Sequence, residues 1–338
     1  MLEGKLKMDT AVYEKMGVTM SADDVLKSFV PYAERILITG CHGLLGQKLH
    51  QQLSPTNEII GLDLAGETHL SGRSFQYRAI DITQSSPLID AIIETRPSFI
   101  VNTAAITDVD LCEIERDMCW RVNVLAVENL IRAAKKVGAH LVHISSDYVF
   151  DGLTPPYKET DPVKPLGFYG KSKLASENIL RGCGAPHTIV RTQVLYGVAP
   201  QIRPNFVDFV VDRLTGGGEL KIVDDQTGNP TLADDLARGI ARIIQLRKQG
   251  IYHISGSESI SRYQFARKIA LQFGEDPARI KPIKTADLDQ KAERPKDSTF
   301  CLDKIWQDLK FRPNDVAGGL SEYQRQRRML QTAWGGKK

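Results

Sequence analysis

The residues best suited to chemistry are Ser146, Tyr169 and Lys173, in the stretches HISSDYVFDG and FYGKSKLASE. Tyr169 and Lys173 are four positions apart, so on a helix the phenol and the ammonium would stand on one face. Ser145 and Ser146 end an apolar run and would bring hydroxyls to the same place. Such a set can pass a proton to a carbonyl oxygen while a nicotinamide supplies a hydride. An ordinary exposed helix turn is the alternative that the spacing leaves open.

A glycine-rich turn connects a predicted strand, RILIT, to a predicted helix. Its spacing is GxxGxxG. Glycines allow a tight turn and close approach to a pyrophosphate, and the free N–H groups of the following helix favour negative charge. We interpret the turn as a dinucleotide-binding loop, with a plain strand-to-helix turn as the alternative. The predicted binding residues are Gly40, His42, Gly43, Leu44, Leu45 and Gly46.

Acidic and small residues follow the next three predicted strands. EIIGLD ends in Asp63, whose carboxylate can accept both hydroxyls of an adenosine ribose and would repel a 2′-phosphate. Asp81 and Ile82, at the end of SFQYRAIDI, would lie at an adenine edge. Turn capping by Asp63 and helix capping by Asp81 are the structural alternatives. Ala104 and Ala105 would let a flat cofactor pass close to the backbone.

Composition limits the class of protein. The 338 residues are 42% hydrophobic and 25% charged, which is typical of a globular protein of about two domains. No membrane-length apolar run or signal-peptide core is found, so we expect a cytoplasmic protein without membrane contact. The net charge of +3 is too small to favour nucleic acid. The five cysteines have no metal-ligand spacing, so we expect reduced thiols and no metal. The basic cluster of Arg325, Arg327 and Arg328 is interpreted as a solvated helix face.

The order of predicted elements indicates an α/β fold with a doubly wound, Rossmann-type parallel sheet. Strands and helices alternate over residues 34–192, the predicted dinucleotide-binding domain, and HTIVRTQVLYG is predicted as its sixth strand. Residues 193–338 are expected to form mainly a smaller substrate lobe, with segments of about 220–255 returning to the sheet. Residues 1–33 form an N-terminal extension, in which Ser21 would cap an amphipathic helix.

Taken in order, several segments resemble the extended short-chain dehydrogenase/reductases and, within them, the dTDP-4-dehydrorhamnose reductase family. The segments are TGCHGLLGQ, NTAAITDVDLCE, ISSDYVFDG, PLGFYGKSKLASE, VRTQVLYG, VDDQTGNPTLADDLA, GIYHISG and ERPKDS. The resemblance covers about Arg35 to Leu309. It implies NADH- or NADPH-dependent reduction of the 4-keto group of a nucleotide-linked 4-keto-6-deoxysugar, with dTDP-4-dehydrorhamnose as first choice. It is also compatible with a homodimer as the oligomeric state.

The same resemblance implies roles for single residues. Tyr169 would give a proton to the ketone oxygen, and Lys173 would hold the nicotinamide ribose and lower the pKa of the phenol. Ser146, where the family usually has threonine, would bond to the same oxygen. The implied substrate-binding residues are Ser146, Asp147, Tyr148, Val194 and Asn205. With Asp63 at the ribose and no arginine directly after it, NADH should be preferred over NADPH.

Two positions depart from the family. Val194 stands where the family usually has tryptophan, and Ile106 stands where it often has tyrosine, which leaves the identity of the sugar open. ISSDYVFDGLTPPYKETD is also similar to the regulatory beta subunit of methionine adenosyltransferase. The alternative function is therefore a non-catalytic regulatory subunit, and an epimerase or dehydratase of the same superfamily is the remaining option.

Overall fold

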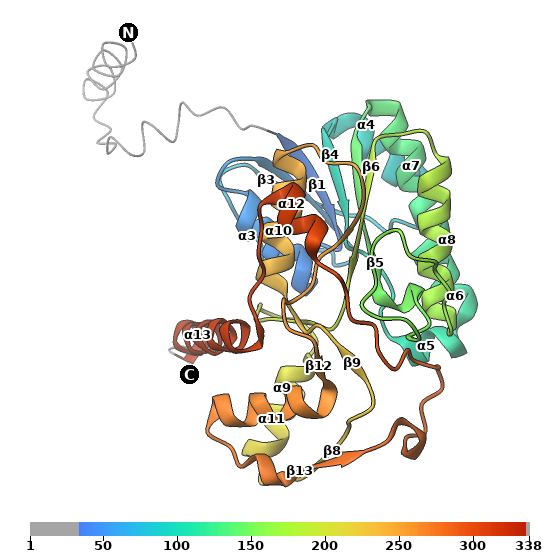
Figure 1. Ribbon diagram of the computed structural model, residues 1–338. Helices are drawn as coiled ribbons and strands as arrows, with labels where there is room; N and C mark the ends of the chain where they lie inside the picture. The colour runs from blue at the N-terminus through green and yellow to red at the C-terminus, as the bar shows by residue number, and fades with distance from the viewer. Residues whose placement is uncertain (1–33, 336–338) are drawn as a thin grey trace, which may run out of the picture.

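The computed structural model describes residues 34–335 of the chain, so the predicted helix after Ser21 lies outside the described residues. At the centre of the described part is a seven-stranded sheet with the order β11-β6-β5-β4-β1-β2-β3 (Figure 1). All of its neighbouring strands are parallel. The strands are β1 (Arg35–Thr39), β2 (Glu58–Asp63), β3 (Phe75–Ala79), β4 (Phe99–Asn102), β5 (His140–Ser146), β6 (His187–Thr192) and β11 (Gly250–His253). The predicted doubly wound α/β fold is confirmed.

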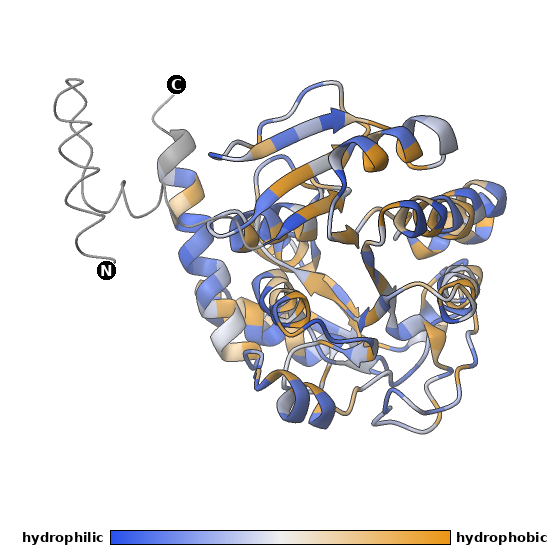
Figure 2. Cartoon of the chain, turned by 90° about the horizontal axis from the view of Figure 1, so that it is seen from above, coloured by the Kyte–Doolittle hydropathy of each residue, from blue (hydrophilic) through white to orange (hydrophobic). Residues whose placement is uncertain are grey.

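Helices cover both faces of this sheet, which explains why its central strands are apolar on both sides. Ile36, Leu37 and Ile38 of β1, for example, are fully buried. One layer contains α3 (Leu44–Leu53), α10 (Ala233–Gln245) and α12 (Asp303–Leu309), and the other contains α4 (Ser85–Thr95), α7 (Ala126–Val137) and α8 (Phe168–Gly182). Figure 2 shows hydrophobic residues gathered along the strands and on the inner faces of the helices.

Short helices border the carboxyl ends of the strands. They are α5 (Val109–Ile114), α6 (Arg116–Trp120), the π-helix η1 (Arg121–Leu125) and the 3₁₀ turn η2 (Asp147–Val149). Hydrophobic contacts join this region to α8, because Cys112 and Cys119 pack with Tyr169 in one small buried cluster. No helix among residues 34–335 is both long and apolar enough to cross a membrane.

The smaller lobe has a hydrophobic core of its own, which includes Val210 and Phe265. Its helices are α9 (Phe206–Thr215), α11 (Arg262–Phe273) and α13 (Val316–Gly335), with 3₁₀ turns η3 (Pro277–Arg279) and η4 (Thr285–Asp287). Its short strand pairs are β7 (Leu195–Tyr196) with β10 (Thr231–Leu232), β9 (Thr227–Gly228) with β12 (Ile260–Ser261), and β8 (Leu220–Val223) with β13 (Ile280–Ile283). The lobe lies below the carboxyl edge of the sheet in Figure 1.

Two details differ from the sequence-based expectations. The return of the chain to the main sheet begins at α10, because β8 pairs with β13 in the lobe. HTIVRTQVLYG is not one strand, since Val194 has a φ of +42° between β6 and β7. A positive φ turns the backbone out of a strand ladder, and it is strained for a β-branched residue.

Arg327 is also not part of a solvated face. Its guanidinium donates to Asp212 at 2.8 Å and lies 3.9 Å from Asp208, both on α9. Burial by the neighbouring elements leaves 24% of the Arg327 side chain exposed. Arg327 therefore attaches α13 to the lobe, whereas Arg325 pairs with Glu322 of its own helix at 2.6 Å.

Candidate active site

A cavity of about 520 Å³ opens where the carboxyl ends of the central strands face the lobe. It lies beside the reversal of strand order between β1 and β4, where sheets of this type bind ligands. The predicted residues that line it are Gly43, Leu44, Leu45, Ala105, Ser146, Asp147, Tyr148, Tyr169, Lys173, Val194 and Asn205. Folding therefore brings residues predicted for catalysis, cofactor binding and substrate binding to one place.

Tyr169 and Lys173 lie on the first turns of α8, and both side chains are buried. The Lys173 Nζ donates to the carbonyl of Ile144 at 3.0 Å and lies 6.0 Å from the centre of the Tyr169 ring. Burial lowers the pKa of Lys173 to about 8. Burial also raises the pKa of Tyr169, and a hydrogen bond with Ser146 opposes this only in part. The resemblance implied a lowered pKa for this phenol, but burial has the larger effect, so the phenol keeps its proton at neutral pH.

Both serines that end β5 line the cavity, but their hydroxyls have different partners. The Ser146 Oγ donates to the Asp147 Oδ1 at 2.9 Å and accepts the N–H of Tyr148 at 3.2 Å. The Ser145 hydroxyl instead donates to Glu177 of α8 at 2.6 Å. Side chains alternate along a strand, which is why neighbouring hydroxyls point to different partners.

Asn123 is a buried residue of the site region to which the sequence analysis gave no role. Its Oδ1 accepts the N–H of Ile106 at 2.9 Å, and its Nδ2 donates to the Ile106 carbonyl at 3.0 Å and to the Ser172 hydroxyl at 3.2 Å. It thereby joins the loop after β4 to α8. The available signal was an amide side chain in the otherwise apolar stretch VNVLAV, which begins in the π-helical turn.

The glycine loop has the close backbone contacts that its spacing predicted. Gly40 has a φ of +67°, and a Cβ there would lie 3.0 Å from the backbone of Ala104. At Gly46 a Cβ would lie 2.3 Å from the carbonyl oxygen of Gly40. No side chain caps the N-terminus of α3, which begins after Gly43. Its first N–H groups are therefore available to an anion.

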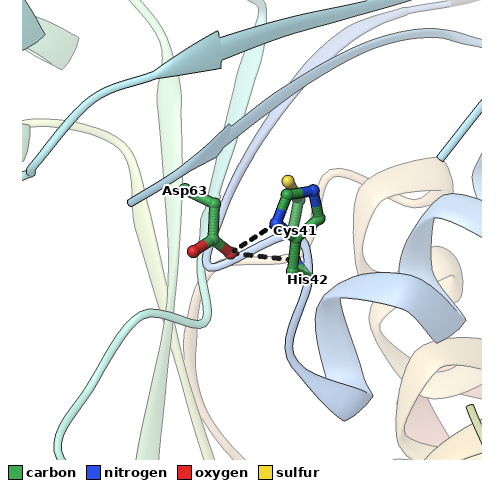
Figure 3. Close-up of side chains that lie close together, drawn as sticks. All are labelled: Cys41, His42 and Asp63. Carbon is green, nitrogen blue, oxygen red and sulfur yellow. Dashed lines mark hydrogen bonds and ion pairs between the residues drawn. The ribbon is translucent and has the colours of Figure 1, made fainter. Parts of the chain in front are cut away.

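Asp63, at the end of β2, lies against this loop (Figure 3). Its Oδ2 accepts the backbone N–H of His42 at 2.9 Å, and its Oδ1 accepts that of Leu64 at 2.8 Å. The Nδ1 of His42 lies 3.9 Å from the same carboxylate. Asp63 thus does cap a turn, and the same bonds hold its carboxylate at the strand end where a ribose would lie.

Cys41, His42 and Asp63 also form a group whose possible metal-ligand atoms lie within 4.8 Å of one another. The sequence analysis considered cysteine spacing alone and did not foresee this grouping. A metal would require the Cys41 thiolate. Burial and the charge of Asp63 raise the pKa of Cys41 to about 12, which disfavours that thiolate. Without a metal, the Cys41 thiol therefore keeps its proton at neutral pH.

Asp81 and Ile82 follow β3 and have mainly local partners. The Asp81 Oδ1 accepts the N–H and the hydroxyl of Thr83, both at 2.8 Å, just before α4. The Ile82 side chain is buried in the sheet core, and its carbonyl accepts from Asn129 at 3.3 Å. Asp81 therefore closes the turn before α4 and does not cap that helix, whose N-cap is Gln84, and Ile82 contributes a core side chain.

The lobe supplies the other wall of the cavity. Asn205 caps α9, since its Oδ1 accepts the N–H of Val207 at 3.0 Å and its Nδ2 donates to the Gly197 carbonyl at 2.8 Å. Arg203 and Arg262 also line the cavity, and the sequence analysis missed both. Arg203 precedes α9 and Arg262 begins α11, and neither position in the sequence indicates where the side chain points.

Comparison with known proteins agrees with this geometry. Residues 34–328 match the family model described as RmlD substrate binding domain. A dTDP-4-dehydrorhamnose reductase from Aggregatibacter actinomycetemcomitans is 34% identical over 295 residues, which are 83% of this chain and 95% of that one. The chain belongs to the dTDP-4-dehydrorhamnose reductase family. The crystal structure of a dTDP-4-dehydrorhamnose reductase from Bacillus anthracis, in complex with NADP, matches this chain with a TM-score of 0.78 at 32% identity. The match covers 87% of this chain and 99% of that one.

A subunit of a different enzyme is similar to this chain too. The methionine adenosyltransferase 2 subunit beta of Pongo abelii is 30% identical over 282 residues, which are 80% of this chain and 81% of that one. The similarity over most of the chain is therefore shared by reductases and by this subunit.

Proposed function

We propose that the protein reduces the 4-keto group of a nucleotide-linked 4-keto-6-deoxysugar with a nicotinamide cofactor, converting dTDP-4-dehydrorhamnose to dTDP-L-rhamnose. The observation that carries this proposal is the meeting of Ser146, Tyr169 and Lys173 with the glycine loop in one cavity. A proton donor and a pyrophosphate-binding turn are both needed for a reduction by hydride transfer. The similar reductases support the same reaction.

The residues fit the proposed cofactor, since Gly43 and Leu44 of the glycine loop line the cavity and no side chain caps the N-terminus of α3. When bound, the nicotinamide supplies the hydride. The N–H groups at the start of α3 would bind the pyrophosphate, and Lys173 would bind the nicotinamide ribose. Tyr169 would give its phenolic proton to the ketone oxygen, and Ser146 would hold that oxygen in place.

Two cations could bind the diphosphate of the sugar nucleotide. Arg203 and Arg262 line the same cavity as Tyr169. The guanidinium of Arg262 lies 5.4 Å from the centre of the Phe206 ring, a contact that restricts its position. Arginine forms strong, charge-assisted hydrogen bonds to phosphate oxygens. Asp147, Tyr148 and Val194 would face the sugar.

NADH is the proposed preferred cofactor, with NADPH as the second choice, because Asp63 ends β2. A cytoplasmic location accompanies the proposal, since free cysteines are typical of that reducing compartment. A homodimer is proposed as the assembly and can be checked by light scattering.

The direct test is oxidation of NADH or NADPH in the presence of a dTDP-4-keto-6-deoxyhexose, with identification of the product. Tyr169→Phe should bind the cofactor as the wild type does yet lose about a hundred- to ten-thousandfold in turnover, because only the transferable proton is removed. Cofactor fluorescence measures the binding. A Phe variant with a near-normal rate would exclude Tyr169 as the acid.

The second candidate is a non-catalytic regulatory subunit, which the similarity to the methionine adenosyltransferase beta subunit favours. This candidate predicts cofactor binding without turnover of any keto-sugar nucleotide. Failure of the wild type to oxidise cofactor with dTDP-4-keto-6-deoxyhexose, under conditions where cofactor fluorescence shows binding, would select it over the reductase.

A further inference from the structure

A chain of hydrogen bonds reaches Ser146 from the C-terminal part of the molecule. The Ser298 hydroxyl donates to the Asp147 Oδ2 at 2.6 Å, and the Ser146 hydroxyl donates to the Asp147 Oδ1 at 2.9 Å. All three side chains are buried, with Ser298 only 5% exposed. Ser298 ends the ERPKDS segment, which has no role in the proposed mechanism.

The single proton of the Ser298 hydroxyl has one clearly better acceptor. The Asp147 Oδ2 lies at 2.6 Å, whereas the Gln193 Oε1 lies at 3.4 Å. Gln193 already accepts the N–H of Asn229 at 2.8 Å through that oxygen. Because the much shorter distance gives the stronger bond, the proton goes to Asp147.

Contacts on both sides hold Ser298 in this position. Its N–H donates to the Thr227 carbonyl at 3.1 Å, and its own carbonyl accepts from the Gln193 Nε2 at 3.2 Å. Upstream in the same segment, Arg294 pairs with Asp110 of α5 at 3.1 and 2.8 Å. Ser298 is therefore hydrogen-bonded to the lobe, and Arg294 of the same segment is paired with the sheet domain.

Asp147 in turn has few other ways to be satisfied. Its carboxyl is buried, and the two serine hydroxyls each occupy one of its oxygens. Without Ser298, the Oδ2 would be left without that partner in a buried site, which is costly, and the carboxyl would turn to find another. The Ser146 hydroxyl would then lose its fixed acceptor.

We propose that Ser298 and Asp147 are positioning residues, which hold the Ser146 oxygen beside the phenol of Tyr169, so that the Ser146 proton can turn from Asp147 to the reacting oxygen when substrate binds. This inference rests on the proposed reductase function. Ser298 acts only through Asp147 and Ser146 and does not itself touch the ketone. A residue 151 positions after Asp147 thus makes the catalytic arrangement depend on correct docking of the C-terminal segment.

The test is a double-mutant cycle on turnover with dTDP-4-keto-6-deoxyhexose and reduced cofactor. Ser298→Ala should lower kcat on the order of tenfold with little change in KM, because misplacement of a catalytic group slows the chemical step. In the Ser146→Ala background the same change should have almost no further effect, because the group that it positions is gone. Ser298→Thr, which restores the hydroxyl, should recover most of the rate.

The outcomes separate the two proposals. A wild type without turnover contradicts the reductase function itself. Normal kcat in Ser298→Ala, or an equal loss in both backgrounds, overturns the positioning role while the reductase stands. If Ser298→Ala does not fold, as judged by thermal unfolding, Ser298→Cys takes its place in the cycle, because a thiol has nearly the same size but is a much weaker hydrogen-bond donor. The loss of kcat in that variant must likewise disappear in the Ser146→Ala background.

Discussion

At the scale of single residues, burial controls the proton chemistry of the cavity. Tyr169 and Lys173 are both buried, and burial disfavours the charged form of each group. The phenol keeps its proton and the ammonium loses its proton more easily. This combination suits a donor that must stay neutral until the substrate oxygen develops charge.

Lys173 should give the reaction an upper pH limit. Its pKa is lowered to about 8, so the ammonium is present below that pH and is lost as the pH rises through it. The value of kcat/KM for the cofactor reports groups of the free enzyme. It should be level below about pH 8 and fall about tenfold for each further pH unit. A profile that stays level up to pH 10 would contradict the role of the Lys173 charge.

Asp63 should decide most of the cofactor preference. Its carboxylate is held by the N–H groups of His42 and Leu64, so it cannot easily turn away from a 2′-phosphate. Two negative charges about 4 Å apart repel by roughly 1 to 4 kcal/mol, depending on the water between them. This corresponds to about a five- to thousandfold preference for NADH.

The matched variants for this prediction are Asp63→Asn, which keeps an acceptor for one N–H but removes the charge, and Asp63→Ala. Both should shift the ratio of kcat/KM for NADH and NADPH toward NADPH. Equal use of the two cofactors by the wild type, or an unchanged ratio in both variants, would show that Asp63 does not select the ribose.

At the scale of elements, a buried ion pair joins α8 to β6 beneath the site. The Arg191 guanidinium donates to both oxygens of Glu177, at 2.8 and 2.7 Å, and neither side chain is more than 1% exposed. Ser145 donates to the same carboxylate at 2.6 Å. The pair fixes the helix that carries Tyr169 and Lys173 against the strands.

Glu177→Gln should lower the free energy of unfolding by about 3 to 5 kcal/mol, because it leaves the buried Arg191 charge without its partner. Chemical denaturation measures this change. Glu128→Gln is the control, since Glu128 forms a partly exposed pair with Arg132 at 3.5 Å and should change stability little. Equal effects of the two variants would mean that the buried pair has no special importance.

At the scale of the whole molecule, histidines buried in the tightly packed fold make its stability sensitive to acid. Burial lowers the pKa values of His140, His143 and His253, so the native state disfavours their protonated forms. The unfolded chain has no such restriction. Over this range the unfolded state binds more protons than the native state, and stability must fall as the pH falls.

His140 allows a quantitative prediction, because its pKa is lowered to about 4 from an ordinary 6.5. Its contribution is complete above about pH 6.5 and is lost as the pH falls toward 4, which amounts to about 3 kcal/mol. His140→Gln, whose amide can still donate to Thr188, should lose less stability than the wild type between pH 7 and 4. Parallel curves from urea unfolding would contradict this.

The sequence by itself determined the sheet, its helical crossovers and the positions of the main polar motifs. These features depend on local patterns, namely apolar runs of strand length, helical periodicity and glycines required by close backbone contact, as at Gly40 and Gly46. It also placed Tyr169 and Lys173 on one helix face. Spacing along a helix is enough for that inference.

Only the tertiary structure decided which side chains from distant segments share an environment. Burial raises the pKa of Tyr169, and Ser298 reaches Asp147 across 151 positions of the chain. Val194 adopts its strained backbone inside what looked like one continuous strand. A sequence pattern records neighbours within a few residues, whereas desolvation and long-range hydrogen bonds depend on how elements pack against one another. That difference explains why the motifs were predictable and their electrostatics and partners were not.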